Sequence, residues 1–233
     1  EFTAKERDLI ECLNTQSQVI LQRHAQSAAN AGFVALMNKY EGKDNIPKEV
    51  HLENNFNPEL RDTKLSDLGL QQCIESQKVA NQLNIHTVLV SPLRRTILTA
   101  YNVYKNHPNF ENIKFLLVPS MRESLNITSD TPLHIDEVME EFRQFIPQLD
   151  DSEIEKRKER HHWFLDDMVF HEDNEAKQKK LYDNLKDDEG DSLGSNFIDI
   201  LTELGKEGYI IKNSPFTLRS ISKPSRVKMG NER

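Results

Sequence analysis

The chain has 233 residues and a formal net charge of −8 at pH 7, from 30 Lys and Arg residues against 38 Asp and Glu residues. A chain of this length forms one large domain or two small ones and closes a hydrophobic core without disulfides. Its 8 glycines and 9 prolines exclude a collagen-like or Gly/Pro-rich disordered chain. The sequence has no run near the roughly 18 apolar residues of a membrane-spanning helix, and its acidity argues against a general nucleic-acid surface.

The two cysteines, Cys12 and Cys73, are far apart and do not have the spacing of metal ligands. We interpret them as thiols of a protein in a reducing compartment, which predicts a cytoplasmic location. The first residue is Glu1 rather than methionine, so a removed organelle-targeting segment stays open as an alternative.

Most of the acidic excess lies in residues 150–191, where 15 acidic residues face 8 basic ones. We interpret this segment as a charged, solvated and partly helical insertion in a single domain that spans residues 1–233. Two roles stay open for it, a surface excursion and a lid over a site. The insertion and a basic C-terminal tail are candidate contacts for protein partners. The tail contains Lys223, Arg226, Lys228 and Arg233.

Strand and helix patterns alternate along the chain. Strands are predicted at residues 17–23, 87–90, 114–118 and 209–211, and helices at residues 28–40, 66–83, 94–104 and 197–204. Apolar strands separated by helices are typical of parallel strands that are buried on both faces. The predicted fold is therefore an α/β three-layer sandwich with a mostly parallel central sheet.

Charged side chains follow the predicted strands at the carboxyl ends, where ligands bind in open α/β sheets. These residues are Arg23-His24 after the first strand, Arg94-Arg95 after the second, Arg122-Glu123 after the third and Lys212-Asn213 after the last. Each residue alone also fits an ordinary surface or ion-pair role. Their convergence at the strand ends is what favours a functional site.

This set of side chains suits a phosphate ester as substrate. A neutral imidazole on His24 can attack phosphorus and form a phosphohistidine. Arg23 and Arg95 can each donate two hydrogen bonds to phosphoryl oxygens. Glu123 can protonate the leaving oxygen and then activate water.

Four elements of the sequence carry a family resemblance. Residues 21–30 (LQRHAQSAAN) fit the pattern R-H-G/A-E/Q-S/T-x-x-N, and residues 62–72 (DTKLSDLGLQQ) fit D-x-x-L-T/S-x-x-G-x-x-Q. Residues 90–100 (VSPLRRTILTA) contain S-P-L-x-R-x-x-x-T-A, and residues 121–123 (MRE) stand in the place of L-x-E. Together and in this order, the elements resemble the histidine phosphatase superfamily, in its phosphoglycerate mutase-like branch.

The resemblance implies a role for each matching residue. His24 is then the phosphate-accepting nucleophile, and Glu123 is the proton donor. The residues implied in phosphate binding are Arg23, Ser27, Asn30 and Arg95. The family has the α/β sandwich predicted above and uses no metal or organic cofactor. We expect a small phosphorylated metabolite as the ligand of this protein.

The sequence departs from the family at its last element, where a second histidine normally follows the final core strand. Asn213 stands at that position. Its amide donates a neutral hydrogen bond, worth about 1 kcal/mol, where a charged donor contributes about 1.5–3 kcal/mol. Lys212 is a second candidate cation, although it points to the opposite face of a strand. The candidate replacement histidines all lie in the insertion: His161, His162 and His171.

Two hypotheses follow. In the first, the protein is a histidine phosphatase of reduced activity that acts on a small phosphate ester through a phosphohistidine. In the second, it is an inactive pseudoenzyme that binds a phosphate ligand or serves as a structural subunit of a complex. A mutase is less favoured, because the sequence shows no pocket that would retain and reorient the intermediate.

Overall fold

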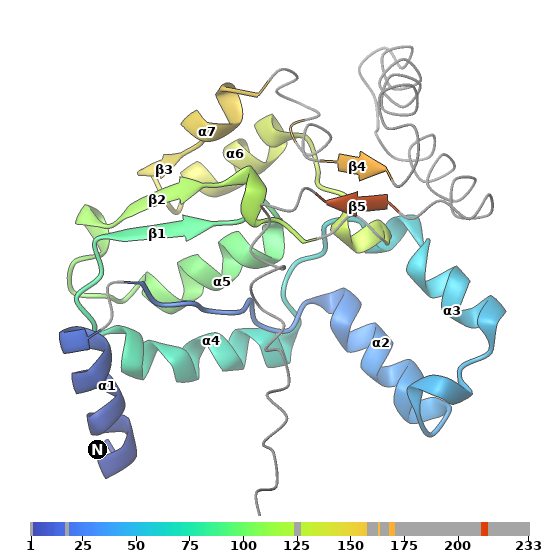
Figure 1. Cartoon of the computed structure of the whole chain (residues 1–233), viewed down its shortest axis with the longest axis horizontal. Helices are drawn as coiled ribbons and strands as arrows, with labels where there is room; N and C mark the ends of the chain where they lie inside the picture. Colours follow the sequence, from blue (N-terminus) through green and yellow to red (C-terminus); the bar gives the residue numbers. More distant parts are fainter. Residues whose placement is uncertain are drawn as a thin grey trace, which may run out of the picture.

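The computed structural model describes residues 2–16, 19–123, 127–157, 163, 168–170 and 211–213. Its α-helices are α1 (Ala4–Gln16), α2 (Ala28–Lys39), α3 (Lys48–Asn55), α4 (Asp67–Ala80), α5 (Arg94–Tyr104), α6 (Ile135–Arg143) and α7 (Ser152–Glu155) (Figure 1). Its strands are β1 (Thr87–Val90), β2 (Lys114–Leu117), β3 (Leu149–Asp150), β4 (Met168–Phe170) and β5 (Ile211–Asn213). Short 3₁₀ helices are η1 (Lys43–Asn45), η2 (Pro58–Leu60), η3 (Phe110–Asn112), η4 (Pro119–Met121) and η5 (Thr128–Asp130).

The central sheet has the order β1-β2-β3, and both of its strand pairs are parallel. Val90 at the end of β1 is in register with Leu117 at the end of β2. The segments that follow these two strands therefore leave the sheet at the same edge, as they must in a parallel sheet. A separate antiparallel pair joins β4 to β5.

Amphipathic helices pack around this sheet. α5 contacts α4 and β1, while α6 contacts β3 and α7 contacts β2 (Figure 1). In α6 the apolar residues recur at helical spacing, and all four are buried: Ile135, Val138, Met139 and Phe142. They join side chains of α5 and β2 in one hydrophobic cluster. The result is the predicted α/β architecture, with a parallel sheet packed against helices.

Most of the predicted elements are confirmed at or near their predicted bounds. The strand at 87–90 and the helix at 94–104 agree with β1 and α5 at both ends. α2 and α4 begin at serine N-caps, where Ser27 accepts from the Asn30 backbone N–H and Ser66 accepts from that of Gly69. A hydroxyl at this position satisfies an N–H group that the helix leaves unpaired.

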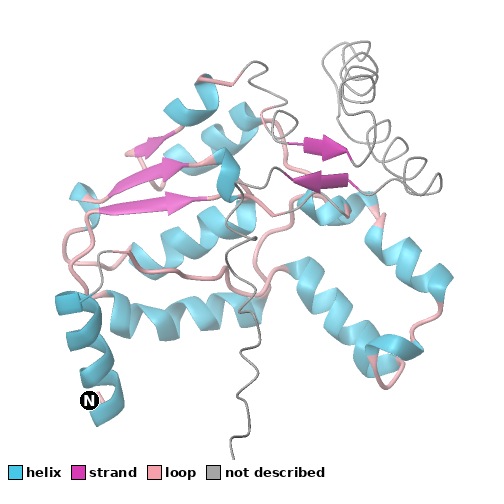
Figure 2. Cartoon of the chain, viewed as in Figure 1, coloured by secondary structure: helices cyan, strands magenta, loops and turns pink. Residues whose placement is uncertain are grey.

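The first predicted strand is wrong. Residues 19–26 have no helix or strand, and in Figure 2 they run as a loop between α4 and α5 before entering α2. Val19 and Leu21 are 77% and 72% exposed, so the apolar run does not reach the core. The backbone makes no ladder with β1 in this part of the structure, and instead the Ala25 N–H donates to Thr99 Oγ1 of α5 at 3.0 Å.

Two further expectations need correction. β1 is not buried on both faces, because Leu89 is 51% exposed at the edge of the sheet. The predicted insertion is not wholly solvated either, since Ile154 and Trp163 are fully buried and belong to the hydrophobic cluster. Its bounds at residues 150–191 remain a prediction.

Several predictions fall outside the described residues: the helix at 197–204, the histidines at 161, 162 and 171, and the basic tail. The final strand lies at Ile211–Asn213 and pairs with β4, not with the central sheet. In the described part of the chain, no helix is long and apolar enough to cross a membrane.

Candidate functional site

A small cavity lies beside His24. Its volume is about 130 Å³, and the loop that carries Arg23 and His24 forms one wall. Gln72 and Cys73 of α4 and Thr99 of α5 line the opposite side. The loop is thus held over the groove between two helices, and its histidine faces a partly polar space.

The element at residues 62–72 cradles the backbone just after His24. The Ser66 N–H donates to Gln26 O at 2.9 Å, and the Gln26 N–H donates to Gln72 Oε1 at 2.9 Å. Gly69 lies so close that a Cβ atom there would be 2.1 Å from Gln26 O. Ser66, Gly69 and Gln72 of this motif therefore have a physical role, because together they fix the distance between α4 and the loop that carries His24.

The His24 ring is held in one orientation by its own chain. Its Nδ1 atom lies 2.7 Å from Ala25 O. Since a carbonyl oxygen only accepts, this contact requires a proton on Nδ1, and a neutral ring then carries a lone pair on Nε2. Burial lowers the pKa of His24 from its ordinary 6.5. The hydrogen bond to Ala25 raises this pKa, and the charges of Arg95 and Arg23 lower it. The neutral, nucleophilic form is favoured.

Ser27 and Asn30 are brought together at the start of α2. Ser27 Oγ donates to Asn30 Oδ1 at 3.0 Å, and the Asn30 N–H donates back to Ser27 Oγ at 3.1 Å. This is the capping-box arrangement of a helix N-terminus. It stabilises the turn that follows the His24 loop.

The two arginines differ in their surroundings. Arg23 is exposed at the cavity, whereas the Arg95 side chain is only 5% exposed. Arg95 Nη1 donates to Ser129 O at 2.6 Å, and its Nη2 lies 3.2 Å from Asp130 Oδ1. Arg95 does not line the small cavity, but its charge acts on the His24 ring.

Glu123 lies in the segment that follows β2, at the same edge of the sheet as the segment that leads to Arg95. It is half-buried, and the neighbouring Arg122 is buried and donates from Nη1 to Glu123 O at 3.0 Å. The two strand-end segments are tied together where they leave the sheet, because the Val118 N–H donates to Val90 O at 2.8 Å.

Asn213 ends β5, where it is paired in register with Met168 of β4. It therefore belongs to the two-stranded sheet and does not follow a strand of the central sheet. Its role in the site stays a prediction.

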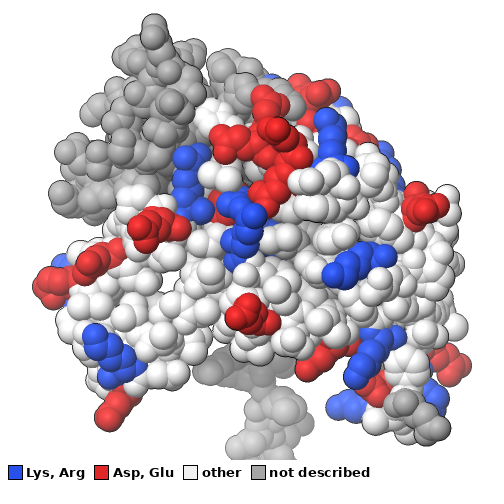
Figure 3. All heavy atoms as spheres, turned by 180° about the vertical axis from the view of Figure 1, so that it is seen from behind, with Lys and Arg blue, Asp and Glu red and all other residues white. Residues whose placement is uncertain are grey.

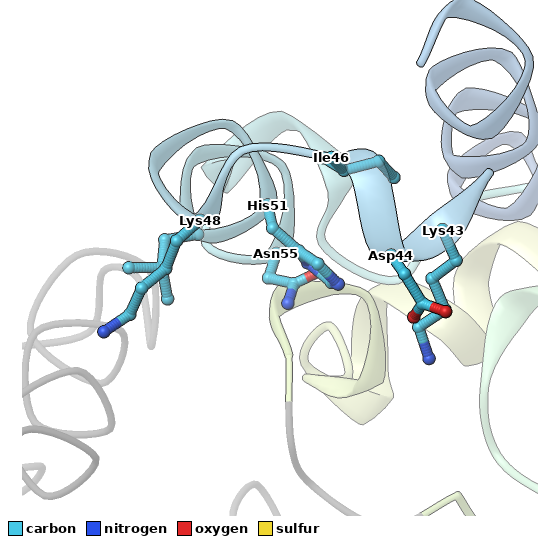
Figure 4. Close-up of a pocket in the computed structure, with 7 residues that line it drawn as sticks. Lys43, Asp44, Ile46, Lys48, His51 and Asn55 are labelled. Atoms are coloured by element: carbon cyan, nitrogen blue, oxygen red, sulfur yellow. The ribbon is translucent and has the colours of Figure 1, made fainter. Parts of the chain in front are cut away.

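A second cavity, of about 450 Å³, lies between η1 and α3 (Figure 4). Lys43, Lys48, His51 and Asn55 line it together with Asp44, and none of the predicted site residues does. The 12-residue helix α2 separates it in the chain from His24, a length of about 18 Å at 1.5 Å per residue. We therefore place the candidate chemistry at the smaller cavity.

The fold and this site define an α/β protein in which Arg95 follows β1 of a parallel sheet, and in which His24 and Arg23 line a cavity with side chains of α4 and α5. A family model described as "Histidine phosphatase superfamily (branch 1)" matches residues 52–175, just over half of the chain. The chain therefore belongs to this superfamily, in its phosphoglycerate mutase-like branch. The match includes Arg95 and Glu123 and begins after His24. Searches of curated proteins and of solved structures gave no match.

The structure adds residues that the sequence did not single out. Asp130 and Asp62 are buried and lie close to the Arg95 charge. Asp62 is the first residue of a recognised element, so its position in the motif could have drawn attention to it. Asp130 gave no such signal, because its contact with Arg95 spans 35 residues of sequence.

Proposed function

We propose that this protein is a histidine phosphatase that hydrolyses small phosphate esters through a phosphohistidine at His24. Membership of the superfamily supports a phosphatase-like function. The observation that carries the finer proposal is the His24 ring itself. Its Nδ1 lies 2.7 Å from Ala25 O and burial lowers its pKa, so both features favour a neutral ring with a nucleophilic Nε2.

In the first step, the lone pair on His24 Nε2 attacks phosphorus, and the bond from phosphorus to the ester oxygen breaks. Glu123, in its acid form, gives its proton to the leaving oxygen, which departs as an alcohol. In the second step the Glu123 carboxylate takes a proton from water. The hydroxide attacks phosphorus, the bond between phosphorus and nitrogen breaks, and His24 returns to its neutral form with inorganic phosphate released.

The remaining predicted site residues bind the phosphoryl group in this proposal. Arg23 and Arg95 donate to its oxygens and offset the charge that develops in the transition state. Asn30 and Asn213 contribute neutral hydrogen bonds, and Ser27 does so once its hydroxyl turns from Asn30 Oδ1 to the phosphoryl group. The chemistry needs only a nucleophile, cations and a proton donor, so the proposal includes no metal or organic cofactor.

Asn213 supports a slow enzyme over a fast one. An amide in place of a cationic histidine gives up about 1.4 kcal/mol of transition-state stabilisation, if a charged hydrogen bond becomes a neutral one. That difference is about tenfold in rate. The same substitution supports the second candidate, a pseudoenzyme that binds phosphate ligands without turnover or serves as a subunit of a complex.

The proposal extends to partners and location. The substrate is a small phosphorylated metabolite, and protein partners bind at the acidic insertion or the basic tail. The proposal includes no nucleic acid, because the chain has a formal net charge of −8 at pH 7. On the one face that Figure 3 shows, the described Lys and Arg residues lie singly or beside Asp and Glu. The location is cytoplasmic, in keeping with Cys12 and Cys73, which no disulfide joins.

Phosphate release from a panel of small phosphate esters tests the proposal, with the wild type beside His24→Ala and His51→Ala. His51 is a matched control because it lines the other cavity. Release by the wild type and by His51→Ala, lost in His24→Ala, supports the phosphatase. Binding of inorganic phosphate without any release favours the pseudoenzyme, and release that persists in His24→Ala contradicts the mechanism.

A further inference from the structure

Arg95 is held by a buried segment that the proposed mechanism does not use. Residues 128–132 are buried, and they contain the two acceptors of the Arg95 guanidinium. Ser129 O accepts from Nη1, and Asp130 Oδ1 accepts from Nη2. A guanidinium has five N–H donors in a fixed plane. Ser129 O and Asp130 Oδ1 therefore fix the orientation of the Arg95 guanidinium through two of its nitrogen atoms.

This segment is itself anchored at its carboxyl end. Arg61 donates from Nε and Nη2 to Pro132 O at 3.1 and 2.7 Å. Asp62 Oδ2 accepts from the Leu133 N–H at 3.2 Å, and its Oδ1 accepts from the Arg94 N–H at 2.8 Å. Asp62 therefore holds both the segment and the first turn of α5, which carries Arg95. Asp62 thus links the segment that contains both acceptors to the helix that carries Arg95.

The ion pair is buried on both sides, since the Arg95 and Asp130 side chains are 5% and 7% exposed. A charge-assisted hydrogen bond in such surroundings is stronger and more directional than one in water. The guanidinium is therefore kept in one plane before any ligand arrives. A preorganised donor loses less freedom on binding than a mobile one.

We propose that Asp130 is a positioning residue for Arg95, which turns the remaining N–H groups of the guanidinium toward the phosphoryl group. The inference rests on the proposed function, because it takes Arg95 as a phosphate ligand. Asp130 acts through the location of its acceptor oxygen rather than through its charge. If a longer side chain moved the carboxylate at position 130, the Arg95 guanidinium would rotate out of the plane in which it binds phosphate.

Two variants separate location from charge. Asp130→Asn keeps an oxygen acceptor at the same place and removes the charge, whereas Asp130→Glu keeps the charge and moves the acceptor by one methylene. The matched controls are Asp151→Asn and Asp151→Glu. Asp151 is also 7% exposed in its side chain, and it accepts from Arg143 Nη2 at 3.0 Å in a pair remote in sequence from Arg95.

The experiment is calorimetric titration of the full chain with inorganic phosphate, below the melting temperature of every variant. We expect Asp130→Glu to weaken phosphate binding about tenfold, which is about 1.4 kcal/mol. Asp130→Asn should bind at or above the wild-type affinity, and both Asp151 variants should match the wild type. Wild-type affinity in Asp130→Glu, or equal weakening in both Asp130 variants, would overturn the inference.

Arg95→Ala distinguishes this failure from failure of the proposed function. If Arg95→Ala binds phosphate as the wild type does, Arg95 is not a phosphate ligand and the proposed site is wrong. If Arg95→Ala loses binding while Asp130→Glu retains it, the site stands and the positioning role alone is refuted.

Discussion

Gly69 offers the sharpest test of how the candidate site is built. A Cβ atom at this position would lie 2.1 Å from Gln26 O, well inside the 3.0 Å that such contacts respect. Because the neighbour is backbone, Gly69→Ala forces the Gln26 segment away from α4. Gly32 is a matched control, since it is also helical and a Cβ atom there meets nothing within 4 Å.

The expected changes in the free energy of unfolding have opposite signs in Gly69→Ala and Gly32→Ala. Overpacking costs about 1–3 kcal/mol, and the hydrogen bonds that Gln26 makes with Ser66 and Gln72 are worth about 0.5–1.5 kcal/mol each. The gain from replacing a helical glycine is only about 0.5–1 kcal/mol. Gly69→Ala should therefore lower the free energy of unfolding by about 2 kcal/mol or more, and Gly32→Ala should raise it by up to about 1 kcal/mol.

Thermal melts followed by circular dichroism measure this difference. At about 2–4 °C per kcal/mol for a chain of this size, we expect Gly69→Ala to melt about 4–8 °C below the wild type and Gly32→Ala slightly above it. The displaced loop should also move the NMR-measured pKa of His24 toward 6.5. If Gly69→Ala melts at the same temperature as Gly32→Ala and keeps the wild-type pKa of His24, the close contact between position 69 and Gln26 O would be refuted.

Three further predictions concern titration and capping. Burial raises the pKa of Asp62 to about 6, outweighing the hydrogen bonds from the Arg94 and Leu133 N–H groups. The folded state thus holds a proton that the unfolded chain releases above about pH 4, so roughly 3 kcal/mol of stability is lost as the pH rises from about 4 to above 6. Urea unfolding should show this loss in the wild type and not in Asp62→Asn; equal pH slopes would contradict it. The pKa of His24, measured by NMR, should lie below 6.5 because burial disfavours the charged ring, and a higher value would remove the argument for a neutral nucleophile. Ser27→Ala should cost about 1 kcal/mol in urea unfolding through loss of the α2 N-cap, and an unchanged midpoint would show that the cap does not hold α2.

Local patterns were sufficient for the elements that pack against the sheet. Residues 87–90 and 94–104 are confirmed as β1 and α5, because a short apolar run and an amphipathic period decide these structures without distant partners. The run at residues 19–21 has the same strand-like composition but stays a loop. A strand also needs a neighbouring backbone, and the sequence does not say whether one is present.

Candidate site residues could be selected where they carry their own chemistry. His24, Arg95 and Glu123 could be selected from their place after predicted strands, although the strand before His24 does not form, and their roles as nucleophile, cation and acid stay predictions. Their supports could not be selected in this way. The contact of Asp62 with Leu133 spans 71 residues, and the need for glycine at 69 arises from a backbone 43 positions earlier. Such contacts follow from the folded arrangement, and no local pattern records them.

The most direct test of the account is whether His24 becomes phosphorylated. The full chain is mixed with a reactive phosphate ester, quenched in alkali to preserve an acid-labile phosphohistidine, and digested for mass spectrometry. The account predicts one added phosphoryl group on the peptide that contains His24, absent from His24→Ala and present in His51→Ala. Turnover of the ester without a phosphoryl group on His24, or with one on another residue, would contradict it.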